Sequence, residues 1–149
     1  MSILPPIHNA FLGLGANLGD RLDSLQGALV TISNWPRCTV VWESAVLETP
    51  PWGPVKEQPY YLNQVIQIRT AQPVLALLDL IRETEWQAGR RDKEEEEKGA
   101  RTLDIDILLF DDLVHCMPHL TLPHPSLDRP YLAPFLEEVK ARVDEGVKF

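Results

Sequence analysis

Hydrophobic residues recur along this chain with two different periods, and each period predicts a type of element. Spacings of three and four, which place side chains on one face of a helix, occupy residues 21–33 and 73–89. Asp20 stands at the N-cap position before the first segment, and Gly89 closes the second. A shorter helix is expected over residues 129–143. The pattern therefore predicts three helices.

Four other segments have the composition or alternation of strands. An apolar run begins at His8 and ends in glycines, and residues 38–49 are rich in β-branched side chains. Residues 60–70 alternate between two faces, and residues 102–110 are strongly apolar. The second and third strands are expected to pair as a hairpin, because only the proline-rich segment 50–59 joins them.

The order is strand, helix, strand, strand, helix, strand, helix, which fits one domain spanning residues 1–149. This split βαβ order predicts an α+β fold: a ferredoxin-like βαββαβ sandwich with an antiparallel sheet and helices packed on one or both faces. An open parallel α/β sheet is the alternative. The direct hairpin in the middle of the chain argues against it.

Charge and cysteine content limit the classes of partner and location. The chain has 14 basic and 22 acidic residues, a net charge of −8, which argues against nucleic acid or an anionic membrane as a partner. Cys38 and Cys116 lack metal-site spacing and are expected to be buried or idle thiols in a reducing compartment, with a disulfide between them as the alternative. Apolar runs stay below the roughly 18 residues of a membrane span, and residues 1–10 do not resemble a signal peptide. The expected location is cytoplasmic.

Two aspartates in the last expected strand are the strongest chemical signal. Asp104 and Asp106 share one face of that strand, roughly 7 Å apart, while Ile105 and Ile107 point to the other face. Two carboxylates, completed by substrate phosphates, are a usual way to hold Mg²⁺. A chance pair of acids at a solvated strand end is the alternative. Arg101, three residues earlier, favours the phosphate interpretation because guanidinium binds phosphate oxygens in a bidentate manner.

Three further features carry weaker signals. Segment 13–19 has three glycines without dinucleotide-binding spacing, and is interpreted as a tight turn before a capped helix. His124 and Arg129 lie in a proline-stiffened loop. Tyr61 and Asn63 share a strand face, where they could stack on and hydrogen-bond a flat heterocycle or simply pack.

Taken together, five motifs resemble one enzyme family over Leu12 to Phe135. Their order and spacing are those of the 6-hydroxymethyl-7,8-dihydropterin pyrophosphokinases of folate biosynthesis; the motifs are LGLGANLGDR, ETPPWGP, YLNQV, GARTLDIDILLF and LTLPHPSLDR. The combination of RTLDIDIL with TPP and YLN is specific. The resemblance implies a ferredoxin-like fold and transfer of pyrophosphate from MgATP to the hydroxymethyl oxygen of the pterin, with release of AMP.

The resemblance also implies roles for particular residues, each carried over by matching position. Asp104 and Asp106 would bind two Mg²⁺ ions that bridge the ATP phosphates. The pterin would contact Tyr61 and Tyr131, which sandwich its ring, and Asn63, Thr49 and the backbone around Pro51. The phosphates would contact Arg90, Arg101, His124 and Arg129, the residues assigned to catalysis. Glu85 matches a helix position near the ATP site, and the only partners implied are ATP and the pterin.

The chain departs from the family pattern mainly between residues 90 and 101. This segment is about one residue longer than usual, contains the glutamates 94–97, and has Glu97-Lys98 in place of a basic residue and an aromatic. Ala100 replaces a usual proline, and segment 124–129 is one residue shorter. The glutamates are interpreted as a solvated charge run. A non-catalytic ferredoxin-like binding module and, more remotely, a dinucleotide-binding α/β protein are the alternative functions.

Overall fold

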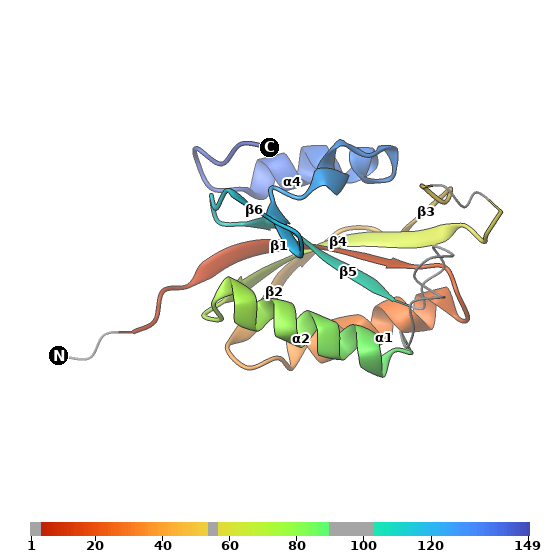
Figure 1. The fold of residues 1–149 in the computed structure, drawn as a ribbon, viewed down its shortest axis with the longest axis horizontal. Coiled ribbons are helices and arrows are strands. Elements are labelled where there is room, and N and C mark those ends of the chain that lie inside the picture. Colours follow the sequence, from red (N-terminus) through yellow and green to blue (C-terminus); the bar gives the residue numbers. More distant parts are fainter. Residues whose placement is uncertain (1–3, 54–56, 90–102) are drawn as a thin grey trace.

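The computed structural model describes residues 4–53, 57–89 and 103–149. Its centre is an antiparallel sheet in which the strands lie in the order β2-β4-β1-β5, and β3 also pairs with β4 (Figure 1). The strands are β1 (His8–Ala16), β2 (Cys38–Glu43), β3 (Leu47–Thr49), β4 (Tyr61–Thr70) and β5 (Asp104–Phe110). Every strand pairing within the described residues is antiparallel, so the predicted α+β class is confirmed and the parallel alternative is wrong.

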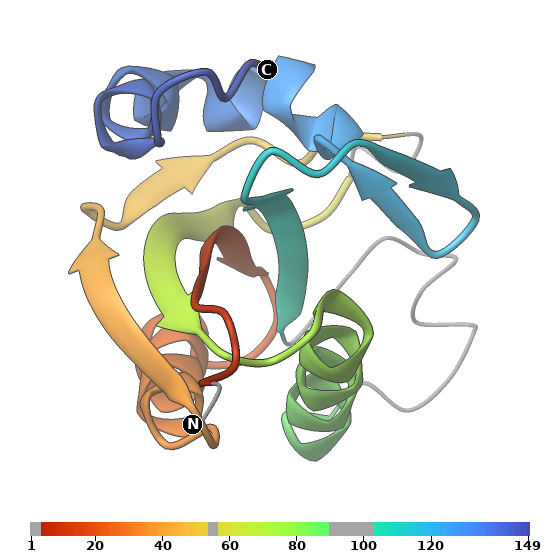
Figure 2. The same ribbon diagram turned by 90° about the vertical axis from the view of Figure 1, so that its left-hand side faces the viewer.

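Helices cover both faces of the sheet (Figures 1 and 2). Helices α1 (Arg21–Ser33) and α2 (Val74–Gln87) lie on one face. The 3₁₀ segments η1 (Pro125–Asp128) and η2 (Pro130–Phe135), followed by α4 (Leu136–Arg142), lie on the other. Among the described residues, no helix combines the length and apolar character needed to span a membrane.

Alternation along the strands produces two cores, one on each face of the sheet. In β1, Leu12 and Leu14 pack in the cluster shared with α1 and α2, whereas Phe11 packs in the cluster shared with η2 and α4. In β5, Ile105 belongs to the first cluster and Leu108 to the second. Asp104 and Asp106 therefore lie on the η2 side of the sheet, because they alternate with Ile105.

Two expected elements differ from the structure for local reasons. The expected strand 38–49 is interrupted between β2 and β3 at Ser44, whose Oγ accepts a hydrogen bond of 2.9 Å from the Val65 N–H. The expected helix 129–143 begins as 3₁₀ helix and becomes α-helix only at Leu136. Pro134, inside this segment, lacks the N–H that an α-helix would bond to the carbonyl four residues earlier, whereas Pro130 at the first position is compatible with either type of helix.

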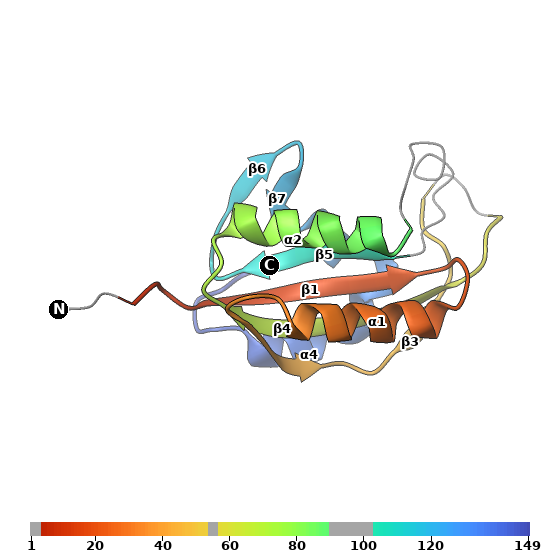
Figure 3. The same cartoon turned by 90° about the horizontal axis from the view of Figure 1, so that it is seen from below.

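A small second sheet was not expected from the sequence. Strands β6 (His115–Met117) and β7 (Leu120–Leu122) form a hairpin, labelled in Figure 3, and β7 contacts β5. Three residues are too few for a strand to be recognised by alternation. The hairpin leads directly into His124, so it sets where that residue approaches the sheet.

Candidate active site

Three adjacent strands bring the predicted site residues into one row. Gly15 of β1 pairs with Asn63 of β4 on one side and with Asp104 of β5 on the other. Two residues earlier in β1, Gly13 pairs with Asp106 of β5. The amide of Asn63 therefore lies on one side of β1 and the two carboxylates lie on the other side, and β1 has glycine at the two positions that face them.

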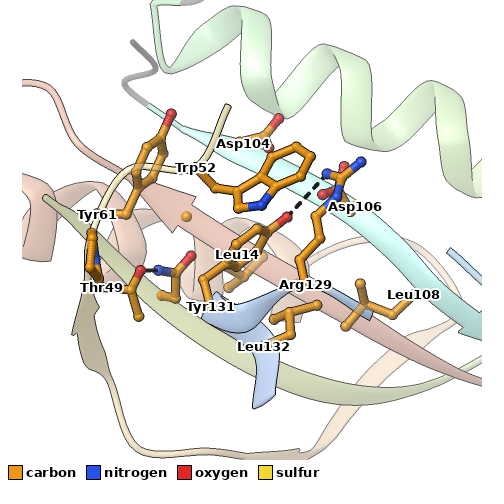
Figure 4. A pocket seen from close by; sticks show the side chains of 14 residues that line it. Leu14, Thr49, Trp52, Tyr61, Asp104, Asp106, Leu108, Arg129, Tyr131 and Leu132 are labelled. Atoms are coloured by element: carbon orange, nitrogen blue, oxygen red, sulfur yellow. Dashed lines mark hydrogen bonds between the residues drawn. The ribbon is translucent and has the colours of Figure 1, made fainter. Parts of the chain in front are cut away.

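A pocket opens over this row on the η2 side of the sheet (Figure 4). Its volume is about 220 Å³. The lining residues are Gly13, Leu14, Gly15, Thr49, Pro50, Trp52, Tyr61, Asn63, Asp104, Asp106, Leu108, Arg129, Tyr131 and Leu132. Segments far apart in the sequence therefore share one cavity, with carboxylates on the β5 side and aromatic and amide groups on the β3–β4 side.

The glycines of β1 make room for the pocket. A Cβ atom on Gly15 would lie 3.1 Å from Asn63 Oδ1 and 3.4 Å from a ring carbon of Tyr61. The interpretation of segment 13–19 as a turn is correct only for its end: Gly19 has a φ of +66°, whereas Gly13 and Gly15 lie inside β1. Their function here is to keep the pocket floor free of side chains.

Asp104 and Asp106 fit the requirements of a Mg²⁺ site. Both are half-buried and line the same cavity. Among the described residues there is no group of three or more His, Cys, Asp or Glu placed to hold a metal ion. A pair of carboxylates suits Mg²⁺, which normally keeps several waters and binds substrate phosphates in addition to one or two protein carboxylates.

Three polar side chains line the opposite part of the pocket. Asn63 and Thr49 are buried, and the Asn63 Nδ2 donates a hydrogen bond to the Thr49 Oγ1. Tyr61 is half-buried on the same face of β4. Because neighbouring polar groups and an aromatic ring face one cavity, this wall can stack on a planar ligand and hydrogen-bond its edge.

Arg129 and Tyr131 close the pocket from the η2 side. The Arg129 Nη1 lies 3.4 Å from the Tyr131 hydroxyl, to which it donates a hydrogen bond. Burial raises the pKa of Tyr131. The hydrogen bond and charge of Arg129 act in the opposite direction, while the charges of Asp106 and Asp104 raise the Tyr131 pKa further. Tyr131 is therefore a neutral ring and hydroxyl at physiological pH.

His124 lies beside the carboxylate pair. Its Nε2 is 3.6 Å from Asp106 Oδ1, and its Nδ1 accepts a hydrogen bond of 3.0 Å from the Ser126 N–H at the start of η1. Burial lowers the pKa of His124, and the charge of Arg129 lowers it too, while Asp104 partly opposes both. A neutral His124 with Nδ1 as acceptor carries its proton on Nε2, facing Asp106.

The remaining predicted residues lie at the edge of the pocket or outside the described part of the chain. Pro51 is half-buried between Pro50 and Trp52, which line the cavity. Glu85 is buried in α2 and accepts a hydrogen bond of 2.9 Å from the Ile105 N–H, so it braces β5 between the two aspartates. Outside the described residues lie Arg90, Arg101 and the glutamates 94–97. The ligand roles of all these residues stay predictions.

Trp52 is the main pocket residue to which the sequence assigned no role. It follows β3, is 52% exposed, and lies with its ring 4.1 Å from the Arg129 guanidinium carbon. The sequence signal for Trp52 was its position in a proline-rich segment. Residues in a loop show no periodicity from which the direction or burial of a side chain could be predicted. The part of the site that the structure describes combines two carboxylates, a guanidinium and aromatic rings, which is typical of enzymes that transfer a phosphate-containing group with Mg²⁺.

Comparison with known proteins identifies the family. The 7,8-dihydro-6-hydroxymethylpterin-pyrophosphokinase (HPPK) family matches residues 11–141. A 2-amino-4-hydroxy-6-hydroxymethyldihydropteridine pyrophosphokinase of Bacillus subtilis is 33% identical over 137 residues, covering 91% of this chain and 80% of that protein. One of Methylorubrum extorquens is 36% identical over 115 residues, covering 77% and 71%. The chain therefore belongs to the HPPK family.

A solved structure shares the fold. The crystal structure of Plasmodium falciparum HPPK-DHPS has a TM-score of 0.53 and 15% sequence identity, covering 83% of this chain and 38% of that one. Family membership makes the protein a pterin pyrophosphokinase, a transferase of folate biosynthesis, as the five motifs predicted. It does not favour the alternatives of a non-catalytic module or a dinucleotide-binding protein.

Proposed function

We propose that this pocket transfers the pyrophosphoryl group of ATP to the hydroxymethyl oxygen of 6-hydroxymethyl-7,8-dihydropterin. The hydroxyl oxygen would form a bond to the β-phosphorus of ATP. The bond between the β-phosphorus and the oxygen that bridges the α- and β-phosphates would break, so AMP leaves and the hydroxyl proton is released. The observation that carries the proposal is the row Asn63–Gly15–Asp104 across three paired strands. It puts a wall suited to a flat heterocycle and a carboxylate pair suited to MgATP in the same cavity.

The pterin would occupy the side of the pocket formed by β3, β4 and η2. Tyr61 and Tyr131 would stack on opposite faces of its planar ring. Asn63 and Thr49 would hydrogen-bond its amide edge, together with the backbone around Pro51. The Asn63–Thr49 hydrogen bond supports this arrangement, because it fixes the orientation of the amide before a ligand arrives.

The nucleotide would extend its phosphates along β5. Asp104 and Asp106 would hold two Mg²⁺ ions, which neutralise phosphate charge and lower the pKa of the attacking hydroxyl. His124 and Arg129 would donate hydrogen bonds to phosphate oxygens. His124 lies beside Asp106 and Arg129 lines the pocket, so both are suited to this role. Arg90, Arg101 and Glu85 are assigned to ATP from the resemblance. The protein's contribution is chiefly positioning and charge complementarity.

We also propose the finer fold assignment, a ferredoxin-like sandwich of one domain. With the β2–β3 segment counted as one strand, the order β2-β4-β1-β5 and the split βαβ connectivity support it. The free thiols of Cys38 and Cys116 are compatible with the cytoplasmic location that we propose. The net charge of −8 supports a function on small molecules, without nucleic acid or a membrane surface.

The decisive experiment is AMP release from MgATP with and without the hydroxymethyl dihydropterin. We expect AMP only when both substrates and Mg²⁺ are present, and no AMP after chelation of the metal. Tight pterin binding without AMP formation would contradict the proposal and favour a binding module. AMP release that does not depend on the pterin would contradict the substrate assignment.

A further inference from the structure

Trp52 and Arg129 approach the pocket from different segments and meet across it (Figure 4). Trp52 follows β3, whereas Arg129 lies between η1 and η2. The guanidinium carbon lies 4.1 Å from the centre of the indole ring, within the range of a cation–π contact. With 52% of its surface exposed, Trp52 does not belong to either core cluster.

A second contact restrains the same guanidinium. The Arg129 Nη1 donates a hydrogen bond to the Tyr131 hydroxyl at 3.4 Å. A guanidinium has five N–H donors in one plane. Stacking on Trp52 uses its flat face and the bond to Tyr131 uses one donor, so other N–H groups can still donate to a ligand. Asp104 and Asp106 line the same cavity, so a phosphate chain held there would come within reach of Arg129.

We propose that Trp52 is a positioning residue that holds the Arg129 guanidinium in place for the phosphate chain of ATP. This inference rests on the proposed function. An arginine side chain has many rotamers, and ordering it during binding reduces affinity. Stacking on Trp52 orders the guanidinium beforehand. Trp52 should therefore affect nucleotide affinity through Arg129, and its effect should disappear when residue 129 has no charge.

A double-mutant cycle tests this dependence. Binding of α,β-methylene-ATP with Mg²⁺ would be measured by calorimetry for the unmodified chain, Trp52→Leu, Arg129→Gln and the double variant. We expect Trp52→Leu to weaken binding about two- to fivefold, the range for one cation–π contact. Trp52→Phe should lose less, because it keeps an aromatic face. The double variant should bind as Arg129→Gln does, which a structural role of Trp52 alone would not produce.

A matched control uses a cation–ring contact elsewhere in the chain. Lys140 lies 5.9 Å from the ring centre of Phe149, outside the pocket, so Phe149→Leu should leave nucleotide affinity unchanged. Additive losses in the double variant, or unchanged affinity in Trp52→Leu, would overturn the positioning role while the enzyme assignment stands. Failure of the unmodified chain to bind the nucleotide would overturn the proposed function and this inference with it.

Discussion

The carboxylate of Glu85 accepts a hydrogen bond of 2.9 Å from the backbone N–H of Ile105, the residue between Asp104 and Asp106. Both partners are buried, Glu85 at 7% exposure and Ile105 at 4%. A side chain of α2 therefore satisfies a backbone donor of β5 at the point where the carboxylate pair must be aligned. This contact links the helical layer to the candidate metal site.

Glu85→Ala should destabilise the protein more than Glu85→Gln. Alanine leaves the buried Ile105 N–H without this acceptor, which costs about 1–3 kcal/mol of unfolding free energy, whereas the glutamine amide oxygen can still accept. Urea denaturation of the three proteins measures the difference. Nucleotide affinity should follow the same order, because an unbraced β5 holds the aspartates less firmly.

The same pair of variants distinguishes bracing from direct contact with ATP. If Glu85→Gln keeps the unfolding free energy but loses nucleotide binding, the negative charge of Glu85 acts on the ligand or its metal. The role near ATP predicted from the sequence would then replace the bracing role.

Asp104→Asn and Asp106→Asn should each reduce pterin-dependent AMP release by roughly 100-fold or more, since metal coordination contributes several kcal/mol to such reactions. Both side chains are half-buried and line the pocket, so an isosteric amide should leave the fold intact. Steady-state AMP assays at several Mg²⁺ concentrations measure the loss. Thermal unfolding followed by circular dichroism verifies the fold.

Asp112→Asn is the matched control for the carboxylate pair. Asp112 is exposed in the turn after β5, away from the pocket lining, and carries the same change of charge. It should retain full turnover. Normal turnover in either Asp104→Asn or Asp106→Asn would show that the metal assignment is wrong.

Cys38 should make the protein less stable at alkaline pH. Burial raises the pKa of the Cys38 thiol from 9.0 to about 11. Because the folded pKa lies above the unfolded one, this contribution to stability is complete below about pH 9 and is lost as the pH rises through 11. Urea denaturation at pH 8 and at pH values up to 11 should show a steeper decline for the unmodified chain than for Cys38→Ala.

Thiol labelling gives an independent measure of the same environment. Cys116 is exposed, so a thiol reagent at pH 8 should modify it well before Cys38. Equal labelling rates would contradict the burial of Cys38. Parallel stability curves for the two proteins would contradict its raised pKa.

The parts of the site that the sequence predicted are those determined by local alternation. Asp104 and Asp106 share a face because they are two residues apart in a strand, and the same holds for Tyr61 and Asn63. These relationships require no knowledge of how strands pair. The structure places all four side chains in one pocket.

The parts that could not be predicted depend on contacts between distant segments. The register that sets Gly15 between Asn63 and Asp104 follows from the pairing of three strands. Trp52 lies in a loop, where side-chain direction is set by the backbone path and not by a period. The approach of Trp52 to Arg129 joins segments 77 positions apart in the numbering, and no local pattern encodes such a contact.

Gly15→Ala should weaken pterin binding while leaving nucleotide binding almost unchanged. The added Cβ would lie 3.1 Å from Asn63 Oδ1 and 3.4 Å from a ring carbon of Tyr61, so both side chains must shift. Its next neighbour is the Leu62 carbonyl oxygen at 3.9 Å, so the carboxylate of Asp104 is not among its close contacts. Calorimetric titration with each ligand separately should show a selective loss for the pterin.

Tyr61→Ala sets the expected size of that loss. Removing a stacked aromatic costs on the order of 1 kcal/mol beyond the lost contact area, about a fivefold change in affinity. Gly15→Ala should be comparable, because it displaces Tyr61 and Asn63 without removing either. Gly27→Ala is the control: it lies in α1, where a Cβ would meet nothing within 4 Å, so it should raise the unfolding free energy by up to about 1 kcal/mol and leave pterin binding unchanged. Equal losses for pterin and nucleotide in Gly15→Ala would mean that β1 shifts as a whole, and the assignment of the β3–β4 wall to the pterin would lose its support.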